Sequence, residues 1–253
     1  MNIIANYSII SLKKNFTYKT NFIFLILDEL VDCGAVFLFW SSLYELGLHV
    51  EGWGAKSRFV FIGLNLISSA VSNLFVGAQD LQERILDGSL DLDIVKPAPT
   101  WALVTFERCN FLRFILTFPL GLFIAAYGVE SFRQFPIFLG AVLASIMASL
   151  TLELIRASIF VLSFWLKRVS ILVQLLQMIF SLKRYPTSSY TGAFFRFLMM
   201  VMPIAYVASI PTQWLHTGEG LGKIWLLILS FLTTILLLFV LWHRGRKYYE
   251  SAN

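Results

Sequence analysis

Long apolar runs are the feature that most constrains how this chain can fold. Stretches such as 135–160 and 221–242 are almost wholly apolar, and only short polar segments separate the successive runs. An α-helix needs about 20 apolar residues to cross the hydrocarbon core of a bilayer. Charged residues make up 14% of the chain, against about 25% in soluble domains, which is too few to form a soluble surface. The sequence therefore predicts an all-α membrane protein.

The boundaries of the apolar runs predict six transmembrane helices. Residues 1–20 contain three lysines, no acidic residue and scattered apolar side chains. That pattern favours an interfacial helix on the inner membrane surface over a frayed tail. Residues 21–253 then form one transmembrane domain. Its predicted spans are 21–44, 59–78, 101–127, 135–160, 169–184 and 221–242.

Prolines interrupt the region before the last span. This segment is apolar but contains Pro186, Pro203 and Pro211, so it is either a seventh span or a re-entrant helical segment. With six spans and an inner N-terminus, 12 of the 20 lysines and arginines lie inside and 7 outside. A seventh crossing would place the basic C-terminal tail outside, against the positive-inside rule. We therefore expect an outer re-entrant segment at 186–218, between spans five and six, and cytoplasmic chain ends.

One polar loop, residues 79–100, holds five of the fifteen acidic residues. Leu81 and Ile85 are four residues apart and would share one face of a helix. Gly88 and Pro97 are typical of positions where a helix stops. A short cytoplasmic helix followed by a break is therefore expected, although composition alone would indicate only a solvated connection.

Charged residues inside the predicted spans are candidate functional residues, because an unpaired charge is costly in the hydrocarbon layer. They can form ion pairs between spans, attract a cationic substrate, or lie shallow at the inner surface, and the sequence leaves these three interpretations open. The first span carries an acidic cluster, and basic residues lie close to acids in the third and fourth spans. The residues are Asp28, Glu29 and Asp32 in the cluster and Glu107, Arg108, Arg113, Glu153 and Arg156 as candidate ion pairs.

The sequence contains no arrangement of residues that supports catalysis by this chain. The three histidines and two cysteines lie far apart, and no metal-ligand spacing or nucleophile–base arrangement occurs. The phosphate-binding motif G-x-x-x-x-G-K-[ST] is also absent, so ATP is expected on a partner chain. The net charge of +5 is typical of basic inner ends in a membrane protein and does not indicate nucleic-acid binding. We therefore expect no catalytic residue, metal or cofactor on this chain.

The polar loop and later segments resemble permeases of the type 2 ABC exporter (ABC-2) superfamily. The resemblance covers about residues 79–253, whereas the N-terminal half agrees in layout only. The turn at Lys167-Arg168 and the acidic cluster of the first span depart from the family pattern. The matching residues are Ile85, Gly88, Leu90-Asp91, Ile94-Val95 and Lys96-Pro97 in the loop, then Phe164-Trp165, Arg184-Tyr185-Pro186, Met202-Pro203 and Ile210-Pro211, and the tail Arg246-Lys247-Tyr248-Tyr249-Glu250-Ser251-Ala252.

The resemblance implies a subunit of an efflux transporter in the bacterial inner membrane. It would pair with a second permease, identical or related, above two ABC ATPase subunits that carry ATP and Mg²⁺. A path lined by the first, second and fifth spans would export a hydrophobic or amphipathic substrate, including drug-like cations. The implied coupling residues are Asp80, Glu83, Arg84, Asp87, Gly88, Asp91 and Pro97, and the outer gate is Tyr185, Pro186, Pro203 and Pro211. Candidate path residues besides the acidic cluster are Phe194, Met199 and Met202, although aromatic and methionine side chains in such a segment more often face lipid or the core.

Two other classes of protein stay open. A secondary transporter would show internal repeats with broken spans at matching positions. A membrane-embedded lipid-modifying protein would show a catalytic constellation. A P-loop ATPase as a partner would distinguish the ABC permease from both.

Overall fold

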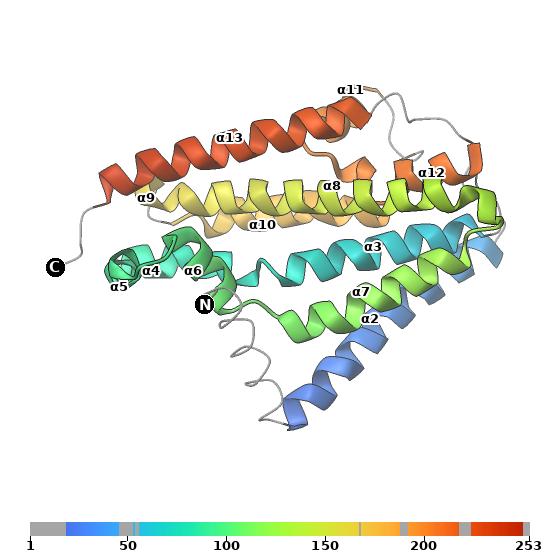
Figure 1. Cartoon of the computed structure of the whole chain (residues 1–253), viewed down its shortest axis with the longest axis horizontal. Helices are drawn as coiled ribbons and strands as arrows, with labels where there is room; N and C mark the ends of the chain where they lie inside the picture. Colours follow the sequence, from blue (N-terminus) through green and yellow to red (C-terminus); the bar gives the residue numbers. More distant parts are fainter. Residues whose placement is uncertain are drawn as a thin grey trace.

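A computed structural model of the chain describes residues 19–45, 53, 56–166, 168–187, 192–217 and 224–249. Helices contain most of these residues, and none of the described residues lies in a β-strand. The long helices run side by side in one bundle (Figure 1). The predicted all-α membrane fold is thereby confirmed. The predicted interfacial helix at 1–20 lies outside the described residues, apart from its last two positions.

Long helices occupy the regions of the predicted spans. In the described part of the chain, the segment Phe132–Leu166 and the last helix are each long and apolar enough to cross a membrane. Two bent helix pairs raise that number to four. The count of six spans remains a prediction. The helices concerned are α2 (Lys19–Glu45), α3 (Ser57–Asn73), α7 (Phe111–Tyr127), α8 (Phe135–Val161), α10 (Ser170–Ser181) and α13 (Ile224–Tyr248).

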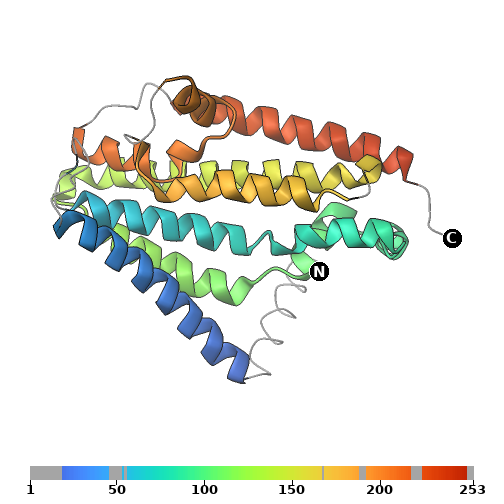
Figure 2. The same cartoon turned by 180° about the vertical axis from the view of Figure 1, so that it is seen from behind.

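Helices α3 and α8 form the centre of the bundle, and α8 contacts α3, α10 and α13 (Figures 1 and 2). The hydroxyl of Ser145 on α8 donates a hydrogen bond to the Leu64 carbonyl on α3 at 3.4 Å. Small residues permit such close approach of helices in membranes. The buried small residues of α8 are Ala141, Ala144, Ser145, Ala148 and Ser149.

Glycines bring α3 and α7 into backbone contact. A Cβ atom added at Gly63 of α3 would lie 2.4 Å from the backbone nitrogen of Ala125 on α7. One added at Gly121 of α7 would lie 2.8 Å from the Gly63 carbonyl oxygen. Both distances are shorter than van der Waals contact, so any side chain here would push the two helices apart.

Helix α2 leans away from α3 and α7 over its N-terminal part (Figures 1 and 2). Near its C-terminal end, the Trp40 ring packs against Phe61 of α3 at 5.2 Å and against Trp53 at 6.4 Å. Other side chains of α2, such as Phe24 and Leu38, are exposed. Helix α2 therefore presents an apolar surface outside the bundle.

Short helices gather at the two ends of the bundle (Figure 1). We call the end of the bundle that contains the short helices of the polar loop the loop end; it also contains the C-terminal end of α13 (Figure 1). This arrangement is the one that the six-span prediction requires. The loop end contains α4 (Leu81–Leu86), α5 (Leu90–Val95), α6 (Thr100–Glu107) and α9 (Ser163–Leu166), and the opposite end contains α11 (Ala193–Met200), η5 (Ile204–Tyr206) and α12 (Ser209–Thr217).

The regions predicted as the second and third spans are bent. Helix α3 ends at Asn73, and the chain turns by 48° into the segment Val76–Leu86. Helices α6 and α7 meet at 73°. Asn110 causes this second bend because its side chain accepts a hydrogen bond from the Arg113 N–H at 3.2 Å and caps α7. Helix α6 therefore belongs to the loop end.

Candidate functional site

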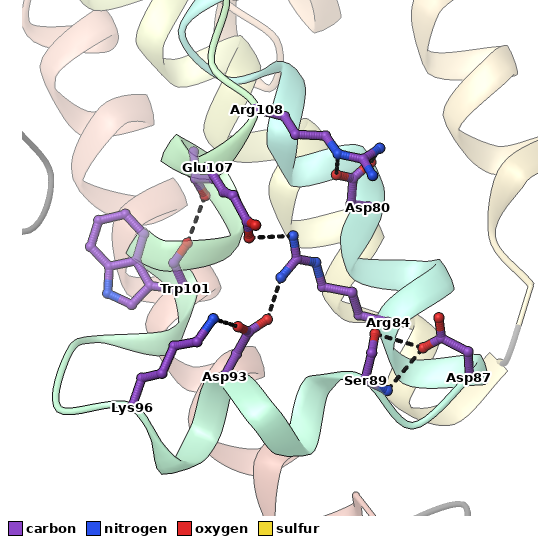
Figure 3. A network of polar contacts seen from close by, with 10 residues as sticks. Asp80, Arg84, Asp87, Ser89, Asp93, Lys96, Trp101, Glu107 and Arg108 are labelled. Atoms are coloured by element: carbon purple, nitrogen blue, oxygen red, sulfur yellow. Dashed lines mark hydrogen bonds and ion pairs between the residues drawn. The ribbon is translucent and has the colours of Figure 1, made fainter. Parts of the chain in front are cut away.

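The polar loop folds into two short helices, α4 and α5, that turn at Gly88. Gly88 has a φ of +76°, in the left-handed region that favours glycine. The Asp87 carboxylate accepts hydrogen bonds from the Ser89 N–H at 2.9 Å and the Ser89 hydroxyl at 2.7 Å (Figure 3). These two bonds lower the pKa of Asp87. The sequence predicts a helix that stops at Gly88, but α5 was not expected.

One arginine connects the three helices of the loop end. The Arg84 guanidinium on α4 donates to Asp93 on α5 and to Glu107 Oε2 on α6, the latter at 2.6 Å (Figure 3). Lys96 Nζ lies 2.6 Å from the other oxygen of Asp93. The Asp93 side chain is 2% exposed, so its charge depends on these two partners. We call Arg84, Asp93, Lys96 and Glu107 the loop network.

Further contacts fix the loop to the bundle. Arg108 Nε lies 3.1 Å from Asp80 Oδ2. The Gln82 side chain accepts a hydrogen bond from the Val169 N–H at 2.8 Å, directly before α10 begins. A Cβ atom at Gly77, in the 3₁₀ helix η1 (Val76–Asp80), would lie 2.4 Å from the Thr105 carbonyl oxygen on α6. The loop therefore touches α6, the residue that ends α6 before α7 begins, and the start of α10 directly.

The C-terminal end of the described chain also meets the loop. Burial, followed by the nearby Asp91 carboxylate, raises the pKa of Tyr249 to about 12. The Tyr249 ring also contacts Phe164 of α9 at 5.9 Å. The tail segment and the loop thus lie together, although they are far apart in the sequence.

Apolar side chains are exposed on the loop helices. Leu86, Leu92 and Val95 are 42%, 71% and 85% exposed. Exposed apolar surface beside polar residues marks contact sites. None of the three was among the predicted coupling residues, although Val95 belongs to the loop pattern that resembles the ABC-2 permeases. Apolar residues inside an otherwise polar loop were the available signal.

The predicted coupling residues divide into two groups. Asp80 and Arg84 face inward and form ion pairs, whereas Glu83, Asp87 and Pro97 are exposed. Gly88 forms the turn between the two helices. Asp91 is half-buried.

A buried ion pair lies in the middle of the bundle. Arg156 Nη1 is 2.9 Å from Glu153 Oε2 on the same helix, α8, and the Glu153 side chain is 2% exposed. The Ser72 hydroxyl of α3 donates to Glu153 at 2.6 Å. The Arg156 guanidinium lies 5.6 Å from the centre of the Phe180 ring on α10. These contacts connect three helices.

Replacing Arg156 with methionine is expected to destabilise the bundle by about 3–5 kcal/mol, because it leaves the Glu153 carboxylate buried without its counter-charge. Thermal unfolding of the purified protein in detergent measures the effect. The double variant Glu153→Gln with Arg156→Met removes both charges and should recover most of the stability. Equal losses in the single and double variants would contradict this explanation.

The remaining candidate ion-pair residues have partners at the loop end. Arg113, in the first turn of α7, pairs with Asp28 of α2. Glu107 and Arg108 pair with Arg84 and Asp80, so the structure places them in the loop contacts and not in an ion pair between spans. The side chains of Glu29 and Asp32 lie outside the described set.

The candidate path residues whose side chains are described, Asp28, Phe194 and Met202, are not all brought together. Asp28 pairs with Arg113 near the loop end, whereas α11, which carries Phe194, lies at the opposite end (Figure 1). Phe194 is exposed and Met202 is half-buried. The Met199 side chain is outside the described set.

The proline-rich segment is firmly packed where it is described. Pro186, Pro203 and Pro211 are buried, and helix α12 packs against α8 and α3. Tyr206 and Trp214 are at most 1% exposed. Tyr185 is 46% exposed and contacts Phe39 of α2 at 6.4 Å between ring centres. This segment therefore covers the end of the bundle opposite the loop.

Comparison with known families identifies the chain. Residues 30–253 match the family described as ABC-2 family transporter protein. The chain belongs to the ABC-2 transporter family. The match contains every candidate site residue except Asp28 and Glu29. No curated protein and no solved structure matches the chain significantly.

Membership of the ABC-2 family confirms the predicted permease. An ABC-2 permease is a membrane transport subunit that associates with an ABC ATPase. It is a multi-pass membrane protein, in agreement with the apolar helices.

Proposed function

We propose that this ABC-2 permease is the transmembrane subunit of an ATP-driven exporter in the bacterial inner membrane. It moves a hydrophobic or amphipathic substrate outward. The observation that carries the proposal is the loop network, in which Arg84 connects α4, α5 and α6. Three helices held together by one largely enclosed arginine form a rigid unit, and a rigid unit transmits a displacement without absorbing it.

The exposed side of the same unit suits a partner protein. Leu92 and Val95 supply apolar contact area, and Glu83 and Asp87 supply exposed charges around it. Protein interfaces commonly combine an apolar centre with a polar rim. The proposed partner is the ABC ATPase, with one loop end on each of two ATPase subunits and a second permease, identical or related, completing the complex.

The contacts between loop and bundle give a route for the movement. Asp80 pairs with Arg108 directly before α7, and Gln82 binds the backbone directly before α10. When the ATPase subunits close on ATP and Mg²⁺, a displaced α4 therefore shifts the ends of α7 and α10. The proposed role of this chain is coupling and conduction, with hydrolysis on its partner.

The surfaces available for substrate are mainly apolar. Leu38 on α2 and Met178 on α10 are more than 60% exposed. Asp28 and Glu153 are both paired with arginines. These observations support a hydrophobic or amphipathic substrate, and selection for cations remains a proposal that depends on the acidic cluster.

Charge placed on the exposed loop surface tests the ATPase contact. The double variant Leu92→Asp with Val95→Asp should lower ATPase co-purification at least tenfold, since an interface anchor contributes about 2 kcal/mol or more. Co-purified ATPase per permease is measured from detergent extracts. Phe132→Asp is the matched control, because Phe132 is 90% exposed near the opposite end. Full ATPase retention by the loop variant, with normal transport, would contradict the proposal.

A further inference from the structure

An apolar cavity of about 440 Å³ lies between α6, α8, α13 and η1. Its volume falls within the range of about 300–1,000 Å³ found for small-molecule sites. Trp101, Trp242 and Thr105 are the only lining residues with a polar side-chain atom. The Thr105 hydroxyl already donates to the Trp101 carbonyl at 2.8 Å. The part of a ligand that enters this cavity must therefore be hydrocarbon.

The length of the cavity matches one leaflet of a bilayer. Its wall on α13 runs from Phe231 to Trp242, a helical rise of about 16 Å. This length is half of the hydrocarbon thickness of about 30 Å. Trp242 lies at the loop end of the wall, and tryptophan side chains favour the membrane–water interface. The cavity thus extends from the interface to about the middle of the membrane.

A basic residue, Arg246, lies beyond the interface end of the cavity. Arg246 follows Trp242 by four residues on α13, so the two share one face of the helix. Arg246 is exposed. Lysines and arginines at this depth attract the phosphates of anionic lipids. The site thus combines an apolar cavity for a hydrocarbon chain with a basic side chain one helical turn beyond the interface end of that cavity.

We infer that this cavity binds one acyl chain of a phospholipid from the leaflet at the loop end, with the lipid phosphate at Arg246. The walls belong to the coupling elements: Leu81 begins α4, and Trp101 and Thr105 lie on α6. A bound chain fills the space between α6 and the two long helices. It thereby holds α6, which carries Glu107 of the loop network, against the bundle.

A photoreactive phospholipid tests the site directly. The full chain is reconstituted in phosphatidylethanolamine–phosphatidylglycerol vesicles that contain a phosphatidylglycerol with a diazirine in its acyl chain, and the labelled residues are mapped by mass spectrometry after irradiation. Label should concentrate on residues 101–106, 150–161 and 231–242. Ala157→Phe and Ile235→Trp fill the cavity from opposite walls, and each should lower this label about tenfold, because packed interiors leave no space for a chain.

Matched controls separate the cavity from the general lipid surface. Leu236→Trp changes an exposed neighbour on α13 and should leave the label in place. Arg246→Gln should reduce labelling about fivefold, the effect of one basic residue at the membrane surface. Label spread evenly over α2, α7 and α13 would show ordinary surface lipid and overturn the inference. Unchanged label in both filling variants would overturn it as well.

Discussion

Arg84→Met is expected to abolish the coupling of ATP hydrolysis to transport while the transmembrane bundle stays folded. Methionine keeps the unbranched apolar stem of the side chain but removes both ion pairs of Arg84. Asp93, which is 2% exposed, then keeps only Lys96 as a charged partner. Removing one partner of a buried polar group costs about 1–3 kcal/mol, and the cost falls on the three short helices that transmit the movement.

Two measurements separate uncoupling from unfolding. Hydrogen exchange should increase in residues 81–107 and stay unchanged in α8, because stability differs between parts of a protein. Transport into proteoliposomes should fall at least tenfold. Arg133→Met, an exposed arginine of the 3₁₀ helix η2 (Phe132–Gln134), should change neither quantity. Normal transport despite faster exchange in the loop would show that rigidity is not required.

Gly63→Ala is expected to destabilise the bundle by about 3 kcal/mol, at the upper end of what overpacking costs. The added Cβ atom would lie 2.4 Å from the Ala125 nitrogen and 2.5 Å from the Gly121 carbonyl oxygen. Both obstructing atoms belong to the backbone of α7, so no side-chain rotation relieves the clash. The two helices must separate along their contact.

Gly140→Ala on α8 is the matched control for this effect. An added Cβ atom at Gly140 meets no described atom within 4 Å. Alanine has a higher helix propensity than glycine by about 1 kcal/mol, so this variant should be neutral or slightly more stable. Thermal unfolding in detergent compares the two variants. Equal stability of Gly63→Ala and Gly140→Ala would show that α3 and α7 do not touch as described.

The class of fold and the positions of most long helices could be predicted from the sequence, because apolar runs are local information. Helix α8 covers Phe135–Val161 where the sequence predicts a span at 135–160. The bend between α6 and α7 was not predicted, because the third span was drawn across the polar stretch that contains Glu107, Arg108 and Arg113. It depends on Asn110, whose N–H also donates to the Asn73 carbonyl of α3 at 2.9 Å. That contact joins residues far apart in the sequence.

The sequence predicts where the candidate site lies in the chain but not which of its residues contact one another. Arg84 stood out as a charge in a polar loop, whereas its partner Asp93 was not singled out. Hydropathy indicates how deep a residue lies and says nothing about which residue it meets. Glu107 was therefore assigned to a span, although α6 turns it toward Arg84. The exposed Leu92 and Val95 were not among the predicted coupling residues, because that set contained only charged residues, Gly88 and Pro97.

Photo-cross-linking from Leu92 tests most directly the claim that the loop end receives the ATPase. A photoreactive amino acid is placed at Leu92 in the intact transporter, and a second variant carries it at Phe132, which is also exposed and lies near the opposite end. The account predicts a cross-link from position 92 to a chain whose peptides contain a P-loop, and none from position 132. Cross-links to that chain from position 132, with none from position 92, would contradict it.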